Sequence, residues 1–457
     1  MIEEIAPGPR GPLAHVLAVR SGETGPKVRL EHREALVYTL GKAAELEHLI
    51  MLQYLYAAFS LKQRVEEGIT TEALEAVERW RRTLLEIGAQ EMLHLAIVQN
   101  LLTAVGAAPR LARPNFPLPA HAYPSGVRIE LMPLNESALR HFAFLERPEG
   151  MAVDDAEGFE ALDRAASLPR DEEDEIVPQL QEFDTIGQLY RSIGAGIEHL
   201  AGRIGPERLF IGPPDAQATS EHFRWDDLVA VTDVASATRA IDTIVEQGEG
   251  ARGDWRDAHF GRLLGILDEY LAMRAADPGF EPARPVVLAN VRPQVHGSGI
   301  PIITDPGTTR AADLLNVVYE VTLQLLSRYF AHSDETEEQL ATLAEVSISL
   351  MYSALKPLGS VLTTLPVSFE TLGVTAGPAF ELFYEVDYLL PHRAAAWVIM
   401  EERLREAAAF ARRCGLACSP PLMAPLAKVA RSLESSADRL RDAAQADDVQ
   451  LQGGHRG

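Results

Sequence analysis

The segment between residues 31 and 67 constrains the fold of this chain more than any other part of the sequence. Its residues recur at steps of three and four, as they do along one face of a helix. That face carries Leu36, Leu40, Ala43, Glu47, Ile50, Tyr54 and Ala58. Leu49, Leu52, Leu55 and Phe59 add apolar side chains on the other faces. Because a helix that is apolar on most sides is normally buried among other helices, the segment predicts the centre of a helical bundle.

Three further helical patterns complete such a bundle. The second covers Thr71–Val105 and the third runs from about Phe183 to Arg203. The fourth begins near Ala235, breaks over Gly248–Gly253 and resumes from Asp257 to Met273. Four long helices with one long crossover between the second and the third describe a ferritin-like bundle. The predicted fold class is therefore all-α, with a ferritin-like four-helix bundle followed by a second helical domain.

A chain of 457 residues is long enough for two or three domains. The proline distribution and the helical patterns set their expected limits. These are an extended arm (1–30), the bundle (31–276) with its crossover insertion (107–182), a linker (277–309), a second helical bundle (310–447) and a disordered tail (448–457). The insertion is too long for a structureless loop. Within it, the alternating run Val127–Leu131 predicts a strand, and the acidic run Asp171–Glu175 an exposed loop.

The helical patterns of the second domain are expected at about 310–331, 335–356, 378–412 and 421–445.

The charge balance excludes one class of partner. The chain has 66 acidic and 42 basic side chains, a formal net charge of −24, which repels the phosphates of nucleic acids. No stretch of 18 residues is apolar without interruption, so we expect no membrane span. The two cysteines, Cys414 and Cys418, cannot supply a disulfide scaffold. With an acidic start and no leader pattern, the sequence predicts a cytoplasmic protein.

The strongest candidate for chemistry lies on the second helix. Glu91 and His94 are three residues apart, so they project from the same side of that helix, among apolar neighbours. A buried carboxylate is costly unless it is paired or bound to a metal. Glu-x-x-His is also the ligand unit of carboxylate-bridged dinuclear metal sites in helical bundles. The motif arises often by chance, and its alternative interpretation is a surface pair or a buried structural histidine.

The first helix strengthens the metal interpretation. Glu47 lies seven residues before Tyr54 on the apolar face, so its side chain is expected to point inward. An inward glutamate facing Glu-x-x-His on the neighbouring helix makes half of a dinuclear site. For the other half, the third helix offers Gln188 and Tyr190, with Glu182 and Glu198 as substitutes.

On the fourth helix, Glu249 and His259 flank the glycine break. Irregularities inside helices are often functional, and a bulge there would let these two side chains converge. The alternative is an exposed loop that merely separates two helices.

Several of these stretches resemble a known family. They are Glu45–His48, Glu91–Leu95, Arg113–Pro117, Thr185–Tyr190 and Val245–Gly250. They are similar to the ferritin-like domain of the iminophenylpyruvate dimer synthase family, which includes the violacein-pathway imine-dimerising enzyme and the chromopyrrolate synthases. The resemblance covers most of the chain from about residue 31. The known synthases are longer proteins, so this chain resembles their ferritin-like portion.

The resemblance implies an iron-containing bundle that acts in oxidative, often secondary, metabolism. It implies metal ligands at Glu47, Glu91, His94, Glu249 and His259. Gln188 stands where the family commonly has a glutamate. An amide is a weaker, neutral ligand, so the number of bound metals stays open at this stage.

The sequence thus predicts a non-haem iron enzyme, with manganese as the second choice of metal. It would use dioxygen or peroxide to oxidise a small amino-acid- or imine-derived substrate, with Tyr54 and Tyr190 tuning the centre through hydrogen bonds. One alternative is a non-catalytic metal-binding or scaffold protein of a biosynthetic complex, in which Gln188 marks a degraded site. Another is a haem-dependent oxidase, although the sequence has no Cys-x-x-Cys-His motif. A homo-oligomer is compatible with the sequence.

Overall fold

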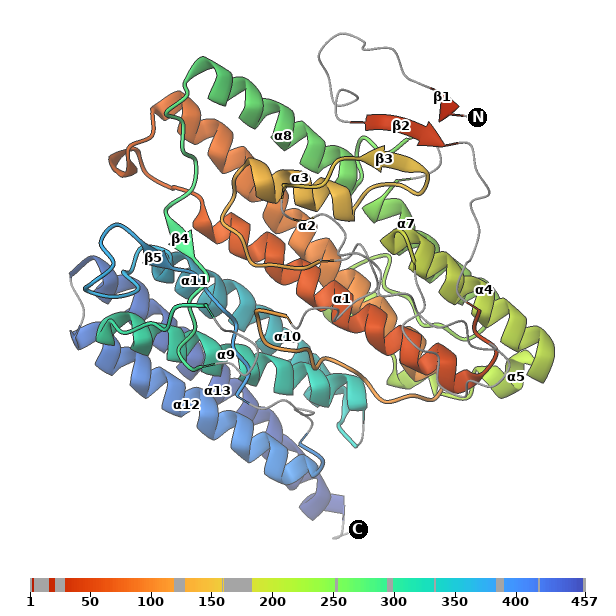
Figure 1. The fold of residues 1–457 in the computed structure, drawn as a ribbon. Helices are drawn as coiled ribbons and strands as arrows, with labels where there is room; N and C mark the ends of the chain where they lie inside the picture. Colours follow the sequence, from red (N-terminus) through yellow and green to blue (C-terminus); the bar gives the residue numbers. More distant parts are fainter. Residues whose placement is uncertain are drawn as a thin grey trace. The chain divides into compact units, whose positions relative to one another are not determined.

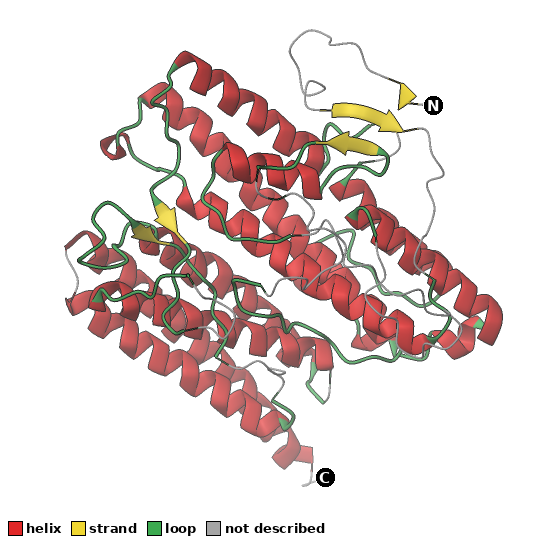
Figure 2. Ribbon diagram, viewed as in Figure 1, coloured by secondary structure: helices red, strands yellow, loops and turns green. Residues whose placement is uncertain are grey.

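The structure of the protein is a computed structural model. It describes residues 2–3, 16–20, 29–118, 128–157, 159, 183–250, 254–293, 299–332, 334–383, 390–417 and 420–454. The chain forms two compact units. Unit 1 comprises Met1–Ala107, Pro119–Asp215 and Asp227–Ala283, and unit 2 comprises Ala108–Leu118, Ala216–Asp226 and Arg284–Gly457. Helices dominate both units, as Figure 2 shows, so the predicted all-α class is confirmed.

Unit 1 contains the ferritin-like bundle. Its main helices are α1 (Arg33–Ser60), α2 (Thr71–Ala104), α4 (Ile186–Ile204), α7 (Val234–Gly248) and α8 (His259–Ala276). Helix α1 packs along α2, and α4 packs along α7 (Figure 1). The predicted fourth helix is thus two separate helices, which end and begin on either side of the glycine break. Residues 251–253 of that break lie outside the described residues.

Helix α1 is buried on all sides, as its apolar faces predict. Every residue from Ala43 to Ser60 except Leu55 is buried. Helix α2 is capped by the preceding residue, Thr70, whose side chain accepts a hydrogen bond from the backbone N–H of Ala73. Two long helices that bury much of each other's surface form a frame for the side chains between them.

The crossover insertion contributes a helix and a strand. Helix α3 (Glu136–Leu145) packs against α8. Strand β3 (Met151–Val153) pairs in antiparallel fashion with β2 (Val16–Arg20), which in turn pairs with β1 (Ile2–Glu3). The expected N-terminal arm therefore supplies two strands. The acidic run Asp171–Glu175 lies outside the described residues.

The strand expected at Val127–Leu131 does not form over its described residues, Arg128–Leu131. Side chains occupy the backbone groups that a neighbouring strand would need. The N–H of Glu130 donates to Gln53 Oε1 at 3.2 Å, and the carbonyl oxygen of Arg128 accepts from His141 Nε2 at 2.6 Å. The alternation of apolar and polar residues here reflects one buried side of a loop.

Unit 2 is also a helical bundle. Its helices are α9 (Pro306–Ala331), α10 (Glu337–Leu350), α11 (Lys356–Leu362), α12 (Arg393–Ala417) and α13 (Pro420–Gly454), with a π-helical turn at Met351–Leu355 between α10 and α11. Short elements include α5 (Pro206–Leu209) in unit 1, α6 (Ser220–Phe223) in unit 2, and the parallel pair β4 (Val286–Val287) and β5 (Thr375–Ala376) in unit 2.

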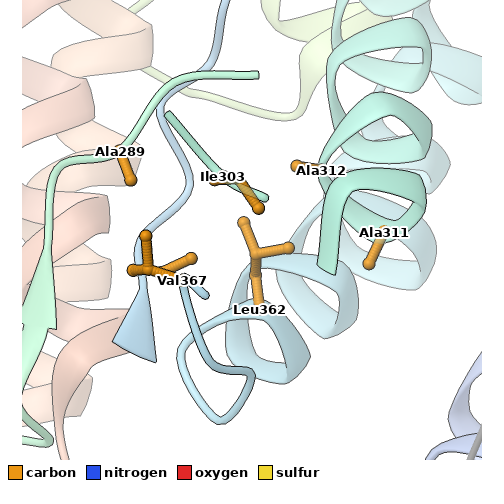
Figure 3. Packing of buried hydrophobic residues seen from close by; sticks show 7 residues of the cluster. Ala289, Ile303, Ala311, Ala312, Leu362 and Val367 are labelled. Carbon is orange, nitrogen blue, oxygen red and sulfur yellow. The ribbon is translucent and has the colours of Figure 1, made fainter. Parts of the chain in front are cut away.

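Figure 3 shows one apolar cluster of unit 2, where small residues of α9 meet the end of α11. It consists of Ala289, Ile303, Ala311, Ala312, Leu362, Val367 and Ala376. The expected linker 277–309 therefore takes part in the packing of unit 2 through Ala289 and Ile303, and α9 already begins at Pro306.

Two expected boundaries in unit 2 are wrong. The helix expected over 378–412 begins only at Arg393. The preceding backbone is held by side chains instead: Asn316 accepts from the N–H of Glu381 at 3.1 Å, and Asn115 accepts from that of Leu382 at 2.7 Å. At the other end, α13 continues to Gly454, through most of the expected disordered tail. Within the described residues, no helix is both long enough and apolar enough to cross a membrane.

Candidate metal centre

The interiors of α1 and α2 bring three predicted residues together. His94 Nδ1 lies 3.0 Å from Glu91 Oε2 and 3.5 Å from Glu47 Oε2. Each of the three residues is only 2% exposed. Two carboxylates and an imidazole in this arrangement can hold a metal ion.

A second group lies on the other side of Glu91. His259, the first residue of α8, has its Nδ1 2.9 Å from Glu91 Oε1 and 3.8 Å from Glu146 Oε1. Glu146 ends α3 and is 6% exposed. Glu91 therefore belongs to both groups and offers a different oxygen to each histidine.

Sequence reasoning missed Glu146, although the signal that identified Glu47 is also present here. Leu139, Phe142 and Glu146 follow one another at steps of three and four, so they share the buried face of a short helix. The helix was not recognised because it has only ten residues and lies in the long crossover.

The carboxylates of Glu47 and Glu146 each also accept a hydrogen bond from a tyrosine. Tyr190 Oη donates to Glu47 Oε1, and Tyr54 Oη donates to Glu146 Oε1, both at 2.5 Å. Burial raises the pKa of both phenols, and the neighbouring carboxylates raise it further, so both hydroxyls keep their protons. At Glu47 the tyrosine occupies Oε1, and the other oxygen, Oε2, faces His94. At Glu146 the tyrosine and His259 approach the same oxygen, Oε1.

Both histidines direct Nδ1 toward the carboxylates and Nε2 toward a glutamine. His94 Nε2 donates to Gln247 Oε1 at 3.1 Å, and His259 Nε2 donates to Gln90 Oε1 at 3.3 Å. Hydrogen bonds of this kind fix the orientation of a metal-binding imidazole. Sequence reasoning did not assign a role to either glutamine.

Two buried atoms show that these residues fit a metal. Glu91 Oε1 and His259 Nδ1 form no hydrogen bond with any described residue, although they are 2.9 Å apart. Buried polar atoms without a hydrogen bond are rare and costly. A cation between the two atoms would satisfy both, and a set of carboxylates and imidazoles suits iron or manganese.

The electrostatics point the same way. Burial and the charge of Glu91 raise the pKa of Glu47 to about 8. Burial also disfavours the ionised form of Glu91, but His259 and His94 outweigh it and hold the pKa of Glu91 well below its usual range. Burial alone would lower the histidine pKa values, yet the carboxylates raise them to about 10 for His94 and about 9 for His259. Without a cation, the cluster therefore takes up protons to balance its charge.

The comparisons with known proteins identify the family of this chain. The family model described as Ferritin-like matches residues 40–268, about half of the chain. The chain belongs to the ferritin-like family. The matched region contains both groups of candidate ligands.

Two curated relatives of this ferritin-like protein confirm the resemblance seen in the sequence. One is a dichlorochromopyrrolate synthase from Lentzea aerocolonigenes, 28% identical over 93% of this chain and 44% of the relative. The other is a 2-imino-3-(indol-3-yl)propanoate dimerase from Chromobacterium violaceum, 31% identical over 80% of this chain and 36% of the relative. The chain spans less than half the length of either relative. A solved ferritin-like protein from Caulobacter vibrioides superposes with a TM-score of 0.43 at 19% identity, over 70% of this chain and 95% of its own.

Two residues expected among the ligands of this ferritin-like centre have other partners. Gln188 accepts from the N–H of Asp184 at 2.7 Å and donates to Glu149 at 3.2 Å, so its amide closes the start of α4. Glu249 lies at the end of α7 and forms an ion pair with Arg191 at 2.5 Å. Neither contributes to the two groups described above. The substitute Glu198 is exposed, and Glu182 lies outside the described residues.

A glycine allows the position that Glu249 takes. A Cβ atom at Gly187 would lie 2.3 Å from Glu249 Oε2, so a larger residue there would displace the Glu249 carboxylate. The carboxylate of Glu249 therefore packs on the start of α4, whereas His259, the first residue of α8, lies at the centre.

A small cavity of about 20 Å³ adjoins the centre and lies between the start of α4 and the C-terminal ends of α3 and α7. Glu146 and Tyr190, which contact the two groups, line it together with Gly248. A cavity of this size has room for about one water molecule.

Proposed function

We propose that this chain is an oxidoreductase that uses a dinuclear non-haem iron centre to oxidise a small amino-acid- or imine-derived metabolite with dioxygen or peroxide. The observation that carries the proposal is the position of Glu91 between two buried groups, each with its own histidine and its own second carboxylate. A carboxylate shared between two such groups is the arrangement of dinuclear sites in ferritin-like bundles.

Each of the two metal positions would have three ligands, and Glu91 would belong to both. Glu47, Glu91 and His94 would hold one ion, while Glu91, Glu146 and His259 would hold the other. Bound iron would accept electrons from the substrate and pass them to the oxidant. The protein supplies the remaining conditions. Its helices exclude water from the carboxylates, which strengthens their attraction for a cation.

The tyrosines have a positioning role in this proposal. The hydroxyl of Tyr190 bonds to Glu47 Oε1, so Glu47 Oε2, which faces His94, is held toward the ion. The hydroxyl of Tyr54 bonds to Glu146 Oε1, the oxygen that also lies near His259, and so fixes the direction of that carboxylate. Burial raises the pKa of both phenols, so they stay protonated and donate hydrogen bonds throughout the physiological pH range. Neither tyrosine would therefore bind a metal as a phenolate.

The choice of substrate and oxidant rests on two further observations. One relative is named for an imino acid that carries an indole, and the other is named as a synthase of a chromopyrrolate, so we infer an imine or amino-acid derivative of secondary metabolism. The cavity beside Glu146 and Tyr190 has room for about one water molecule, which supports a small oxidant such as dioxygen or peroxide at this place and not the metabolite itself.

Metal analysis and oxygen uptake test the proposal together. After anaerobic reconstitution with ferrous iron, we expect two iron ions per chain, and oxygen consumption that depends on an added amino-acid-derived imine. Glu91→Gln should lose both. Glu45→Gln is the matched control. Glu45 is buried like Glu91, but it lies on α1 and pairs with Lys42 at 3.1 Å.

Two outcomes would contradict the proposal in different ways. Less than one metal ion per wild-type chain would remove the metal centre altogether. Two bound ions without substrate-dependent oxygen uptake across a panel of imines would indicate a metal-binding scaffold without turnover. A Soret band in the purified protein would instead point to haem.

A further inference from the structure

The two halves of the centre are built from different parts of their helices. Glu47, Glu91 and His94 lie in the interiors of α1 and α2, with helical turns on both sides. Glu146 is the residue that ends α3, and His259 is the first residue of α8. Because helix ends fray and helix interiors do not, the first half is the more preorganised.

The hydrogen bonds behind the histidines differ in the same direction. His94 Nε2 donates to Gln247 Oε1, and the amide nitrogen of Gln247 donates to Asp227 Oδ2 at 3.3 Å. A chain of hydrogen bonds that ends on a carboxylate polarises each member of the chain. The oxygen of Gln247 becomes a better acceptor, and His94 becomes a stronger donor to a cation at Nδ1.

Behind His259 the neighbouring charge has the opposite sign. The oxygen of Gln90 accepts from His259 Nε2 at 3.3 Å and from Arg262 Nη1 at 2.9 Å. The guanidinium competes for the amide oxygen, so His259 receives less support. The guanidinium of Arg262 also adds a positive charge near the place where a cation would bind. Its pairing with Glu86 offsets this charge only in part, since the Glu86 side chain is 65% exposed and water screens the pair.

We propose that the two metal positions are unequal and fill in a fixed order. The first ion binds to Glu47, Glu91 and His94 with the higher affinity. The second ion binds to Glu91, Glu146 and His259 and is held more weakly, with Arg262 as the residue that weakens it. The inference rests on the proposed dinuclear centre. It implies that the protein has a one-metal form whenever free metal lies between the two dissociation constants.

Titration of the metal-free full chain with Mn²⁺ tests the order. Calorimetry should resolve two steps whose dissociation constants differ by at least about tenfold, the low end of what outer hydrogen-bond partners contribute. Electron paramagnetic resonance should show an isolated ion after the first equivalent and a coupled pair after the second. His259→Ala and Glu146→Gln should each keep the tight step and lose the weak one, whereas His94→Ala should lose the tight step. The two variants of the second position guard against a folding defect in either.

Arg262→Met tests the cause of the asymmetry. We expect the second dissociation constant to tighten by about tenfold while the first is unchanged. Arg79→Met is the matched control, since Arg79 pairs with Glu269 at 2.5 Å and has no contact with Gln90.

Three results would overturn the inference while leaving the dinuclear centre in place. These are two equal dissociation constants in the wild type, loss of the tight step in both variants of the second position, and an Arg262→Met variant whose second step is unchanged. Absence of any Mn²⁺ binding in the wild type would overturn the proposed function itself.

Discussion

Metal binding should release about three protons per chain at pH 7, because the residues that would hold the ions are protonated in the metal-free protein. The pKa values of His94, His259 and Glu47 are raised to about 10, about 9 and about 8, so all three carry a proton at that pH. Each must lose it to bind a cation. Glu91 contributes none, since the two histidines lower its pKa and keep it ionised.

The pH dependence follows from the same values. Protons compete with the metal, so the apparent affinity for both ions rises with pH and is lost as pH falls. Near pH 7 the overall binding constant should increase by about a thousandfold per pH unit, since about three protons leave for each pair of ions. At pH 9 the release should fall to about one and a half protons, because Glu47 has then largely lost its proton and about half of the His259 side chains have lost theirs.

Calorimetry in two buffers of different protonation enthalpy measures this release directly. At one pH, the difference between the apparent binding enthalpies, divided by the difference between the buffer enthalpies, is the number of protons. Glu47→Gln should release about one proton fewer than the wild type at pH 7, while Glu45→Gln should match it. A wild-type release below one proton at pH 7 would mean that both histidines are neutral without metal, and the charge argument for the centre would fail.

Three shorter predictions concern single side chains. His94→Ala should weaken metal binding by at least about tenfold and lower the melting temperature of the metal-loaded protein, as calorimetric scans with and without metal would show; a variant that melts lower but keeps its full metal content would remove His94 from the centre. Tyr190→Phe leaves a buried oxygen of Glu47 without its donor, so the free energy of unfolding should fall by about 1–3 kcal/mol in urea titrations; an unchanged value would show that water replaces the hydroxyl. Gly187→Ala displaces the carboxylate of Glu249 and weakens its ion pair with Arg191, so it should destabilise the fold by at most about 1 kcal/mol, whereas Gly265→Ala, which meets no atom within 4 Å, should not destabilise it.

The half of the centre on α1 and α2 could be predicted because its residues lie within long helices. Inside a helix the period of 3.6 residues fixes which side chains share a face, so Glu47, Glu91 and His94 follow from spacing alone. At a helix end that period stops. Glu249 directly follows α7, and the direction of its side chain depends on where the chain turns, which no spacing reveals.

The same limit applies to the segment before α12. Residues from about 378 onward favour a helix by composition, yet Asn115 and Asn316 bind the backbone groups of Leu382 and Glu381. Hydrogen bonds from residues distant in the sequence override local preference, because they satisfy the backbone as well as helix formation would. Only the folded arrangement of unit 2 brings those asparagines within reach.

The position of Glu91 has a mechanical consequence. Its two oxygens are parts of one rigid, planar carboxylate, and each faces a different histidine. Rotation about the bond that carries this carboxylate would move both oxygens at once, in opposite directions. A rotation that took Oε2 away from His94 would therefore also take Oε1 away from His259. One torsion angle of the Glu91 side chain thus connects the two ends of the cluster. When this angle changes, the contact of Glu91 with His94 and its contact with His259 change together.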